Sequence, residues 1–189
     1  WDPSLGTGGD SAAIEIFCLP DLIQIAEWQH NKTDIRGQLR NLITILEWLR
    51  EKGVQNDNIY WSVENNTLGE AALVAISEYG EERMPGHFIT EPGNKRRGFN
   101  TTNKSKLAAC TKLKYYVESG KMAPKSKNLV QELKTFVAHG ASFAAKEGET
   151  DDLVMGTVLV IRMLQQLTDY HVDLESQMRD HDEIVAPLR

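Results

Sequence analysis

Acidic residues stand at three separated places in the sequence where a strand is expected to end or a helix to begin. Asp2 precedes a glycine-rich turn, Glu64 ends the strand-like stretch IYWSVE, and Asp151 and Asp152 open a long apolar stretch. Carboxylates that are forced together repel, and one takes up a proton unless a cation neutralises them. Mg²⁺ is bound by a few carboxylates together with water and phosphate oxygens. A fold that unites the three places would therefore form a divalent-metal site.

Such a site could cleave a phosphodiester bond. Two ions about 3.5–4 Å apart can bind both the attacking and the leaving oxygen of the reaction. One ion activates a water molecule and the other stabilises the departing 3′ oxygen, so that no histidine or lysine base is required. The five histidines of the chain show no metal-binding spacing. The carboxylates are therefore the main candidates for chemistry.

The aspartate pair also has a purely structural explanation. Aspartate is favourable in the first turn of a helix because it faces the positive end of the helix dipole. Thr150, which precedes Asp151 and Asp152, has the side chain of an N-cap residue. From these residues alone, both explanations stay open.

The elements that must position the carboxylates follow from periodicity and breaker residues. We expect a hairpin over 12–18 and 22–30, helices over 34–53, 68–80, 104–120, 126–138 and 151–169, and strands over 58–66, 87–90 and 141–148. Strands that alternate with helices predict an α/β fold, and the early hairpin makes its sheet mixed. Ligands of open α/β sheets bind at the carboxyl ends of strands. We expect one domain over 1–170 and a polar extension or tail over 171–189.

Composition sets the broad class. The chain has 189 residues, 41% hydrophobic and 25% charged, which is ordinary for a soluble globular domain. No apolar run is long enough to span a bilayer, so we expect no membrane association. No signal peptide is visible, and an opening at Trp1 without Met indicates a piece of a longer protein. Cys18 and Cys110 lie far apart among apolar neighbours and are expected to be free, buried thiols.

Four segments carry a resemblance to a known family. They are DPSLGTGGDSAAI (2–14), VENN (63–66), NKSKLAACTKLKYYVESGKM (103–122) and LVQELKTFVAHGASFAAKEGETDDLVM (129–155). In this order, and over about residues 1–170, the chain resembles the RNase H-like (retroviral integrase) nucleases. More specifically, it looks like the C-terminal nuclease domain of the large terminase subunit of tailed bacteriophages. The most specific segment is ETDDLVM, which closes onto an apolar helix.

The resemblance implies an RNase H-like mixed central sheet with helices on both faces, and a role for each carboxylate. Asp2 would be the first catalytic metal ligand and bridge two Mg²⁺ or Mn²⁺ ions, and Glu64 would be the second. Asp152 would be the third catalytic ligand, since it directly precedes the apolar helix. Asp151 would be a neighbouring or water-mediated metal ligand.

Two departures from the family pattern concern the start of the chain. The strand that should precede the first aspartate is represented only by Trp1. Some family members carry a further acidic residue shortly afterwards, and Leu5 stands at that place here. Asp10 is the nearest substitute, but we favour a turn-stabilising role for it over metal binding.

Basic residues are concentrated between 94 and 134, a segment that contains eleven lysines and arginines but only two glutamates. The whole chain nevertheless has a net charge of −6. Such polarity can present a basic surface to a polyanion. With the resemblance, this surface is predicted to hold DNA phosphates through Lys95, Arg96, Arg97, Lys104 and Lys106. A solvated, lysine-rich helix face is the alternative.

The resemblance implies a metal-dependent DNA endonuclease that cleaves concatemeric viral DNA during genome packaging. Its partners would be double-stranded DNA, an N-terminal ATPase motor domain of the same full-length protein, the portal and the small terminase subunit, in the host cell cytoplasm. No GxxxxGK[ST] motif is present, so the chain would be the nuclease half only. The alternatives are a RuvC-like junction resolvase or transposase-type nuclease, and a non-catalytic RNase H-like module that binds DNA or a partner.

Overall fold

The computed structural model describes residues 1–66, 68–93, 96–140, 142–170 and 177–178. Its elements are β1 (Ala12–Cys18), β2 (Ile23–His30), α1 (Ile35–Glu51), η1 (Asn56–Asn58), β3 (Tyr60–Trp61), α2 (Gly69–Tyr79), η2 (Glu81–Arg83), β4 (His87–Phe88), α3 (Asn103–Glu118), α4 (Lys127–Thr135), β5 (Phe136–His139), β6 (Ser142–Ala145) and α5 (Asp152–Tyr170). This order of strands and helices confirms the mixed α/β class.

The first two residues join two strand pairs into one sheet. β1 and β2 are antiparallel, and β3 and β4 are parallel. The Asp2 backbone exchanges two hydrogen bonds with Ala13 of β1, of 2.8 and 2.9 Å. On the other side, the Trp1 amino group donates to the Ser62 carbonyl, and the Trp1 carbonyl accepts from the Glu64 N–H, both at 2.9 Å. The sheet is therefore mixed, with Trp1 and Asp2 at its centre.

The strand predicted over 58–66 is shorter and divided. Only Tyr60–Trp61 forms a regular strand, which pairs with β4, whereas Glu64 pairs with Phe99 through a single parallel bridge. The change of partner explains the interruption. Beyond Glu64 the chain turns sharply into α2, and a Cβ at Gly69 would lie 2.0 Å from the Glu64 carbonyl oxygen. Glycine is therefore required where α2 begins.

The helix predicted over 126–138 is wrong at its end, because α4 stops at Thr135 and the next residues form β5. β5 pairs antiparallel with β6, and the rings of Phe136 and Phe143 stack with centroids 6.0 Å apart. Aromatic and β-branched residues favour strands where they can pack on a partner strand. The strand predicted over 141–148 is present in part, as β6.

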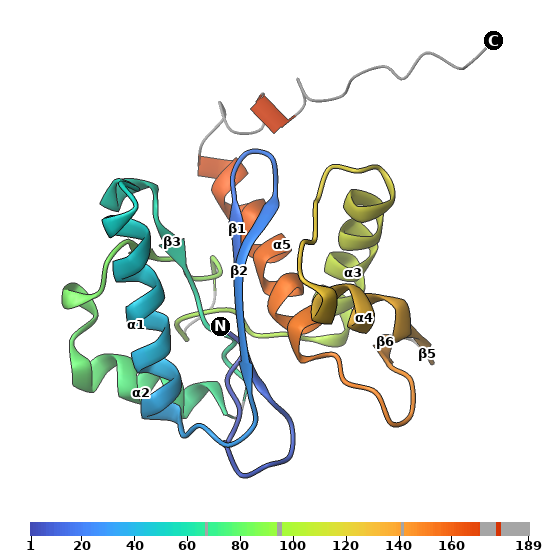
Figure 1. Ribbon diagram of the computed structural model, residues 1–189, viewed down its shortest axis with the longest axis horizontal. Coiled ribbons are helices and arrows are strands. Elements are labelled where there is room, and N and C mark those ends of the chain that lie inside the picture. Colours follow the sequence, from blue (N-terminus) through green and yellow to red (C-terminus); the bar gives the residue numbers. More distant parts are fainter. Residues whose placement is uncertain (67, 94–95, 141, 171–176, 179–189) are drawn as a thin grey trace.

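Two hydrophobic clusters lie on opposite sides of the central sheet. Successive residues of β1 face opposite sides, so Ile14 packs with α1 and Ala13 packs with α5. Figure 1 shows α1 and α2 on one side of the β1–β2 hairpin, and α3, α4 and the β5–β6 hairpin on the other. Residues directly opposite in a ladder face the same side. Asp2, opposite Ala13, therefore faces α5.

A buried arginine links α5 to the segments on both sides of Phe99. Arg162 is 3% exposed and donates hydrogen bonds to Glu91 Oε1 at 2.5 Å, to Thr101 Oγ1 at 3.2 Å and to the Asn100 carbonyl at 3.2 Å. Its guanidinium also lies 5.0 Å from the centroid of the Phe99 ring. Because Phe99 pairs with Glu64, Arg162 helps to set the strand that carries Glu64 relative to α5.

Three further expectations concern the cysteines, membranes and the C-terminal extension. Both cysteines are free as predicted, but only Cys110 is buried, while Cys18 is exposed. No helix in the described part of the chain is long and apolar enough to cross a membrane. The extension predicted over 171–189 lies outside the described residues, apart from 177–178.

Candidate active site

The carboxylates of Asp2 and Glu64 meet at the end of the central sheet. They lie on neighbouring strands, because the Glu64 N–H is bonded to the residue before Asp2. Burial raises the pKa of Asp2 well above its usual range, and the charge of Glu64 and a hydrogen bond with its side chain raise it further. Two carboxyl groups in such contact share a proton unless a cation replaces it. This pair therefore fits a divalent cation by its oxygen ligands and its charge.

Glu64 is held in place by the turn that follows it. Asn66 Nδ2 donates a hydrogen bond of 2.6 Å to Glu64 Oε2. The other end of the Asn66 amide accepts from the N–H groups of Leu68 and Gly69, at 3.0 and 3.1 Å, where α2 begins. Only 5% of Glu64 is exposed. One amide thus connects the orientation of Glu64 to the start of α2.

Asp152 is the first residue of α5, and its charge acts on Asp2. It is among the groups that raise the pKa of Asp2, after Glu64. Burial raises the pKa of Asp152 itself to about 6, with contributions from the charges of Glu132 and Asp10, against hydrogen bonds from the Ser11 N–H and from Gln29. The charge of Asp152 therefore acts on Asp2 from the start of α5, while its side chain is bonded to Ser11 and Gln29.

Asp151 takes a different direction from its neighbour. Its Oδ2 accepts a hydrogen bond of 3.3 Å from the Ala145 N–H at the end of β6. Among the described residues, no group of three or more His, Cys, Asp or Glu side chains is arranged to hold a metal ion. The structure thus brings Asp2 and Glu64 into contact and places Asp152 at longer range. Metal binding by Asp2, Glu64 and Asp152, and by Asp151, stays a prediction.

Glu132 is the residue of this region that the sequence interpretation missed. Its Oε2 accepts from the N–H groups of Leu153 and Val154, at 2.8 and 3.1 Å, in the first turn of α5. Its Oε1 accepts from Thr150 Oγ1 and from Gln29 Nε2, both at 3.0 Å. The predicted capping of this helix by Thr150 is therefore wrong, because a carboxylate from α4 takes that place. An acidic residue on the apolar face of 126–138 was the available signal.

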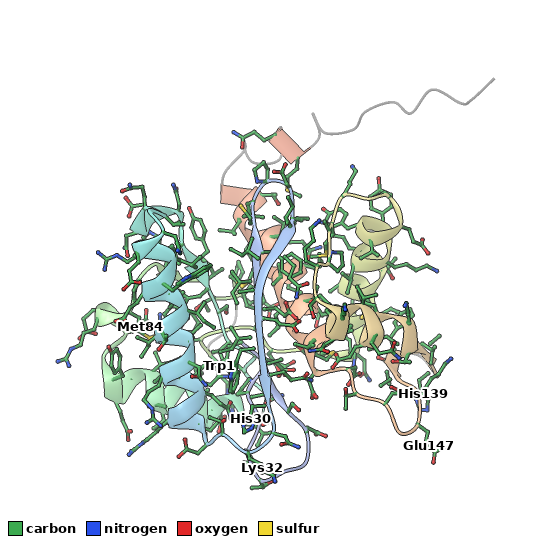
Figure 2. The ribbon with its side chains drawn as sticks, in the orientation of Figure 1. Trp1, His30, Lys32, Met84, His139 and Glu147 are labelled. Carbon is green, nitrogen blue, oxygen red and sulfur yellow. The ribbon has the colours of Figure 1, made fainter. Side chains whose placement is uncertain are left out.

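Replacing Glu132 by alanine is expected to destabilise the protein by about 2 kcal/mol. The variant leaves two helix N–H groups and the Thr150 hydroxyl without their buried acceptor, and loss of a helix cap costs roughly 0.5–2 kcal/mol. Urea unfolding measures the change. Glu147→Ala, in the exposed loop between β6 and α5 (Figure 2), is the matched control and should be neutral. Equal midpoints for the two variants would contradict the capping role.

Gln29 on β2 forms hydrogen bonds with both Glu132 and Asp152. Its Nε2 donates to Glu132 Oε1 at 3.0 Å and to Asp152 Oδ2 at 3.3 Å. An amide donor between two carboxylates reduces their repulsion and fixes both side chains. β2 thereby positions the start of α5 against the sheet.

Four of the five basic residues predicted to hold DNA are described, and they lie in two places. Arg96 pairs with Glu70 at 2.6 Å, and Arg97 pairs with Glu81 and lies 4.6 Å from the centroid of the Phe88 ring. The Asn65 side chain donates to the Arg97 carbonyl at 2.8 Å, so this loop lies beside Glu64. Both arginines already have acidic partners, which weakens their availability for phosphates.

Two other residues predicted to contact DNA, Lys104 and Lys106, lie at the start of α3. Lys104 is exposed there, and Lys106 lies 5.7 Å from the centroid of the Phe136 ring at the start of β5. Lys95 is the residue outside the described ranges. DNA binding by all five residues stays a prediction.

Comparison with solved structures defines the class of fold. No protein-family model matches the sequence. The chain has the RNase H-like mixed α/β fold, and one structure similar to it is the large terminase nuclease from thermophilic phage G20c, determined with bound magnesium. The two share a TM-score of 0.60 and 17% sequence identity, over 81% of this chain and 74% of that chain. The resemblance to terminase nucleases is thus confirmed at the level of the fold.

Proposed function

We propose that this chain is a divalent-metal-dependent DNA endonuclease that cuts concatemeric viral DNA during genome packaging. The observation that carries the proposal is the buried contact between the Asp2 and Glu64 carboxylates, with the charge of Asp152 acting on Asp2 from the start of α5. Buried carboxylates destabilise a fold unless their charge is neutralised, and a bound cation would neutralise these two. The fold likeness to a terminase nuclease determined with magnesium agrees with this proposal.

In this proposal Asp2, Glu64 and Asp152 would hold two Mg²⁺ or Mn²⁺ ions. Such ions, when bound, would supply an activated water molecule and neutralise charge at the phosphodiester. The chain's own groups hold the ligands in place. Asn66 orients Glu64, and Gln29 fixes Asp152 against β2. The Asp2 backbone is hydrogen-bonded to β1, so its carboxylate is presented from the rigid centre of the sheet.

Cleavage of supercoiled plasmid is the direct test. We expect nicked and linear products with Mg²⁺ or Mn²⁺, none with EDTA, and a loss of cleavage in Glu64→Gln and Asp152→Asn. Glu147→Ala is the matched acidic control and should cleave as the wild type does. Metal-dependent cleavage that survives both site substitutions would exclude this site. Linear and four-way-junction DNA, compared in the same assay, separate the proposal from a junction resolvase.

DNA binding should depend on salt through the start of α3. Replacing Lys104 and Lys106 by alanine is expected to reduce the slope of log affinity against log salt by about 2, at roughly 0.9 per phosphate contact. Fluorescence anisotropy of a labelled duplex in EDTA measures the slope. Lys52→Ala, exposed at the end of α1, is the control and should leave the slope unchanged. An unchanged slope in the double variant would place the DNA elsewhere.

The proposal also assigns partners and location. The nuclease acts on double-stranded DNA together with an N-terminal ATPase motor domain of the full-length protein, the portal and the small terminase subunit. These partners follow from the proposed role in packaging, which takes place in the host cell cytoplasm. Association of the purified chain with a portal or small subunit tests this part separately from cleavage.

A further inference from the structure

The proposed site is divided between two parts of the fold, because Asp2 and Glu64 stand on the central sheet whereas Asp152 begins α5. Its geometry therefore depends on how α5 is held against the sheet. Along β1 the two are in close packing contact, since a Cβ at Gly156 of α5 would lie 3.1 Å from Glu15 Cγ. The contact between α5 and the segment that pairs with Glu64 is of a different, polar kind.

A buried guanidinium makes this polar contact. Arg162 Nη2 donates to Glu91 Oε1 at 2.5 Å and to the Asn100 carbonyl at 3.2 Å, and Nη1 donates to Thr101 Oγ1 at 3.2 Å. We call these four residues the α5 clamp. The Arg162 side chain is only 4% exposed, against 28% for Glu91. A guanidinium offers five N–H donors in a fixed plane, so it can hold two separate pieces of chain at once.

The α5 clamp joins Glu91 to residues 98–101, which run beside the strand of Glu64. The Glu91 N–H donates to the Gly98 carbonyl at 3.1 Å. Gly98 has a φ of +78°, and a Cβ there would lie 2.5 Å from the Val63 carbonyl oxygen. Glycine alone combines this backbone conformation with so close an approach. The residues held by Arg162 therefore pack directly against the residue before Glu64.

Phe99, next to the α5 clamp, is bonded to the residues on both sides of Glu64. The Phe99 N–H donates to the Val63 carbonyl at 3.0 Å, and the Phe99 carbonyl accepts from the Asn65 N–H at 2.7 Å. The Arg162 guanidinium lies 5.0 Å from the centroid of the Phe99 ring. A change at Arg162 is thus transmitted to the backbone of Glu64 through one hydrogen-bonded residue.

We propose that Arg162 is a positioning residue that makes the site select Mg²⁺ over the larger Ca²⁺, by fixing where Glu64 stands relative to Asp152. This inference rests on the proposed metal site. Mg²⁺ demands near-ideal octahedral geometry with oxygen ligands at about 2.0–2.1 Å, whereas Ca²⁺ accepts flexible arrangements at about 2.3–2.6 Å. A loosened contact between α5 and the Glu64 strand therefore weakens Mg²⁺ binding more than Ca²⁺ binding.

A purely structural role of the α5 clamp has to be separated from this one. Removing one partner of a buried ion pair is strongly destabilising, whereas replacing both partners by uncharged groups of similar size is often neutral. The double variant Arg162→Met/Glu91→Gln is therefore expected to fold, without the hydrogen bonds to Asn100 and Thr101. Arg162→Lys keeps the charge opposite Glu91, but as a point charge instead of a planar fork.

Calorimetric titration of the metal-free proteins with MgCl₂ and with CaCl₂ tests the selectivity. In the double variant we expect Mg²⁺ affinity to fall by about 10–100-fold, the range for losing a group that orients a metal ligand. Ca²⁺ affinity should fall much less, and Arg162→Lys should lie between the double variant and the wild type. Leu46→Ala is the control, because Leu46 is a 3% exposed core residue of α1 whose loss destabilises the fold away from the site. It should keep the wild-type ratio of Mg²⁺ to Ca²⁺ affinity.

An unchanged ratio in the double variant, with Mg²⁺ still bound by the wild type, would overturn this inference alone. An equal fall in the double variant and in Leu46→Ala would overturn it too, since general loss of stability would then explain the effect. A wild type that binds neither ion would contradict the proposed metal site itself, and this inference with it.

Amide exchange in EDTA tests the mechanical part without any metal. The Asn65 N–H is bonded to the Phe99 carbonyl, so its exchange should speed up about tenfold in the double variant if the α5 clamp holds this strand pair. The Val54 N–H, which donates to the Leu49 carbonyl after α1, is the internal control and should exchange as in the wild type. Unchanged exchange at Asn65 would show that Arg162 does not hold the strand of Glu64, and would overturn the proposal whatever the metal binding.

Discussion

Replacing Asp2 by asparagine is expected to abolish metal-dependent DNA cleavage while raising the thermal stability of the metal-free protein. The loss of activity follows from removal of a proposed metal ligand, and should exceed the roughly 100-fold effect of losing an outer partner of such a ligand. The gain in stability follows from the same carboxylate, because burial and the neighbouring Glu64 both disfavour its charged form. An asparagine amide can instead donate to Glu64. Opposite signs for activity and stability are the mark of a functional site.

The gain in stability of Asp2→Asn should depend on pH. The native pKa of Asp2 lies above its usual value of 3.8, so the folded protein binds more protons than the unfolded chain above that pH. The stability of the wild type therefore falls as pH rises from about 4 toward the native pKa. The asparagine variant has no carboxyl group at this position, so its stability lacks this pH dependence. The advantage of the variant should be largest at alkaline pH and disappear below pH of about 4.

Thermal unfolding in EDTA and plasmid cleavage in Mg²⁺ together measure both effects of Asp2→Asn. Addition of Mg²⁺ should raise the Tm of the wild type, since the ion binds the native state, and leave the variant unchanged. Glu147→Gln is the control and should change neither quantity, because Glu147 is exposed and far from the sheet centre (Figure 2). A variant that loses both activity and stability would show that Asp2 has a structural role instead.

Local patterns in the sequence predicted the helices well, because apolar spacing and cap residues act within one element. α1 begins after Asp34, whose side chain accepts from the Gly37 N–H, and ends just before Gly53. The strand ends at Asp2 and Glu64 were also enough to predict that these carboxylates lie together. Helix boundaries and strand ends of this kind are determined by short stretches of sequence, and strand ends that share one edge of a sheet lie close together.

Features that depend on tertiary contacts were not predictable in the same way. Glu132 caps α5 from a helix some twenty residues earlier, and no local rule connects the two. β5 follows α4 without a breaker residue, and only its pairing with β6 makes it a strand. Arg96 and Arg97 have acidic partners on α2 and η2, which their basic run in the sequence does not indicate. Each of these contacts joins segments whose proximity is set by the whole fold.

Glu15→Gln is expected to stabilise the protein by about 3 kcal/mol at pH 7, with no gain near pH 4. Glu15 is 8% exposed on β1, and one of its oxygens has no hydrogen-bond partner among the described residues. Burial raises its pKa from 4.5 to about 9, and the charges of Glu27 and Glu132 add to this, against a hydrogen bond from Gln24. Folding at neutral pH therefore requires Glu15 to take up a proton.

The sign of the Glu15→Gln effect follows from linkage. The native pKa lies above the unfolded value, so the wild type loses stability as pH rises from about 4.5 to about 9. Glutamine has no proton to take up, it keeps an acceptor for Gln24 Nε2, which lies 2.9 Å from Glu15 Oε2, and its amide can donate to a neighbouring carboxylate. The difference between variant and wild type should therefore grow with pH over this range.

Urea unfolding of Glu15→Gln and the wild type at several pH values between 4.5 and 8 measures this difference directly. Comparing the two proteins at each pH cancels the titration of the other buried groups, including Asp2 and Asp152. A difference that stays constant across the range would show that Glu15 is ionised in the folded protein, balanced by a partner or a cation. A difference that grows with pH would establish that β1 carries a neutral carboxylic acid beside α5.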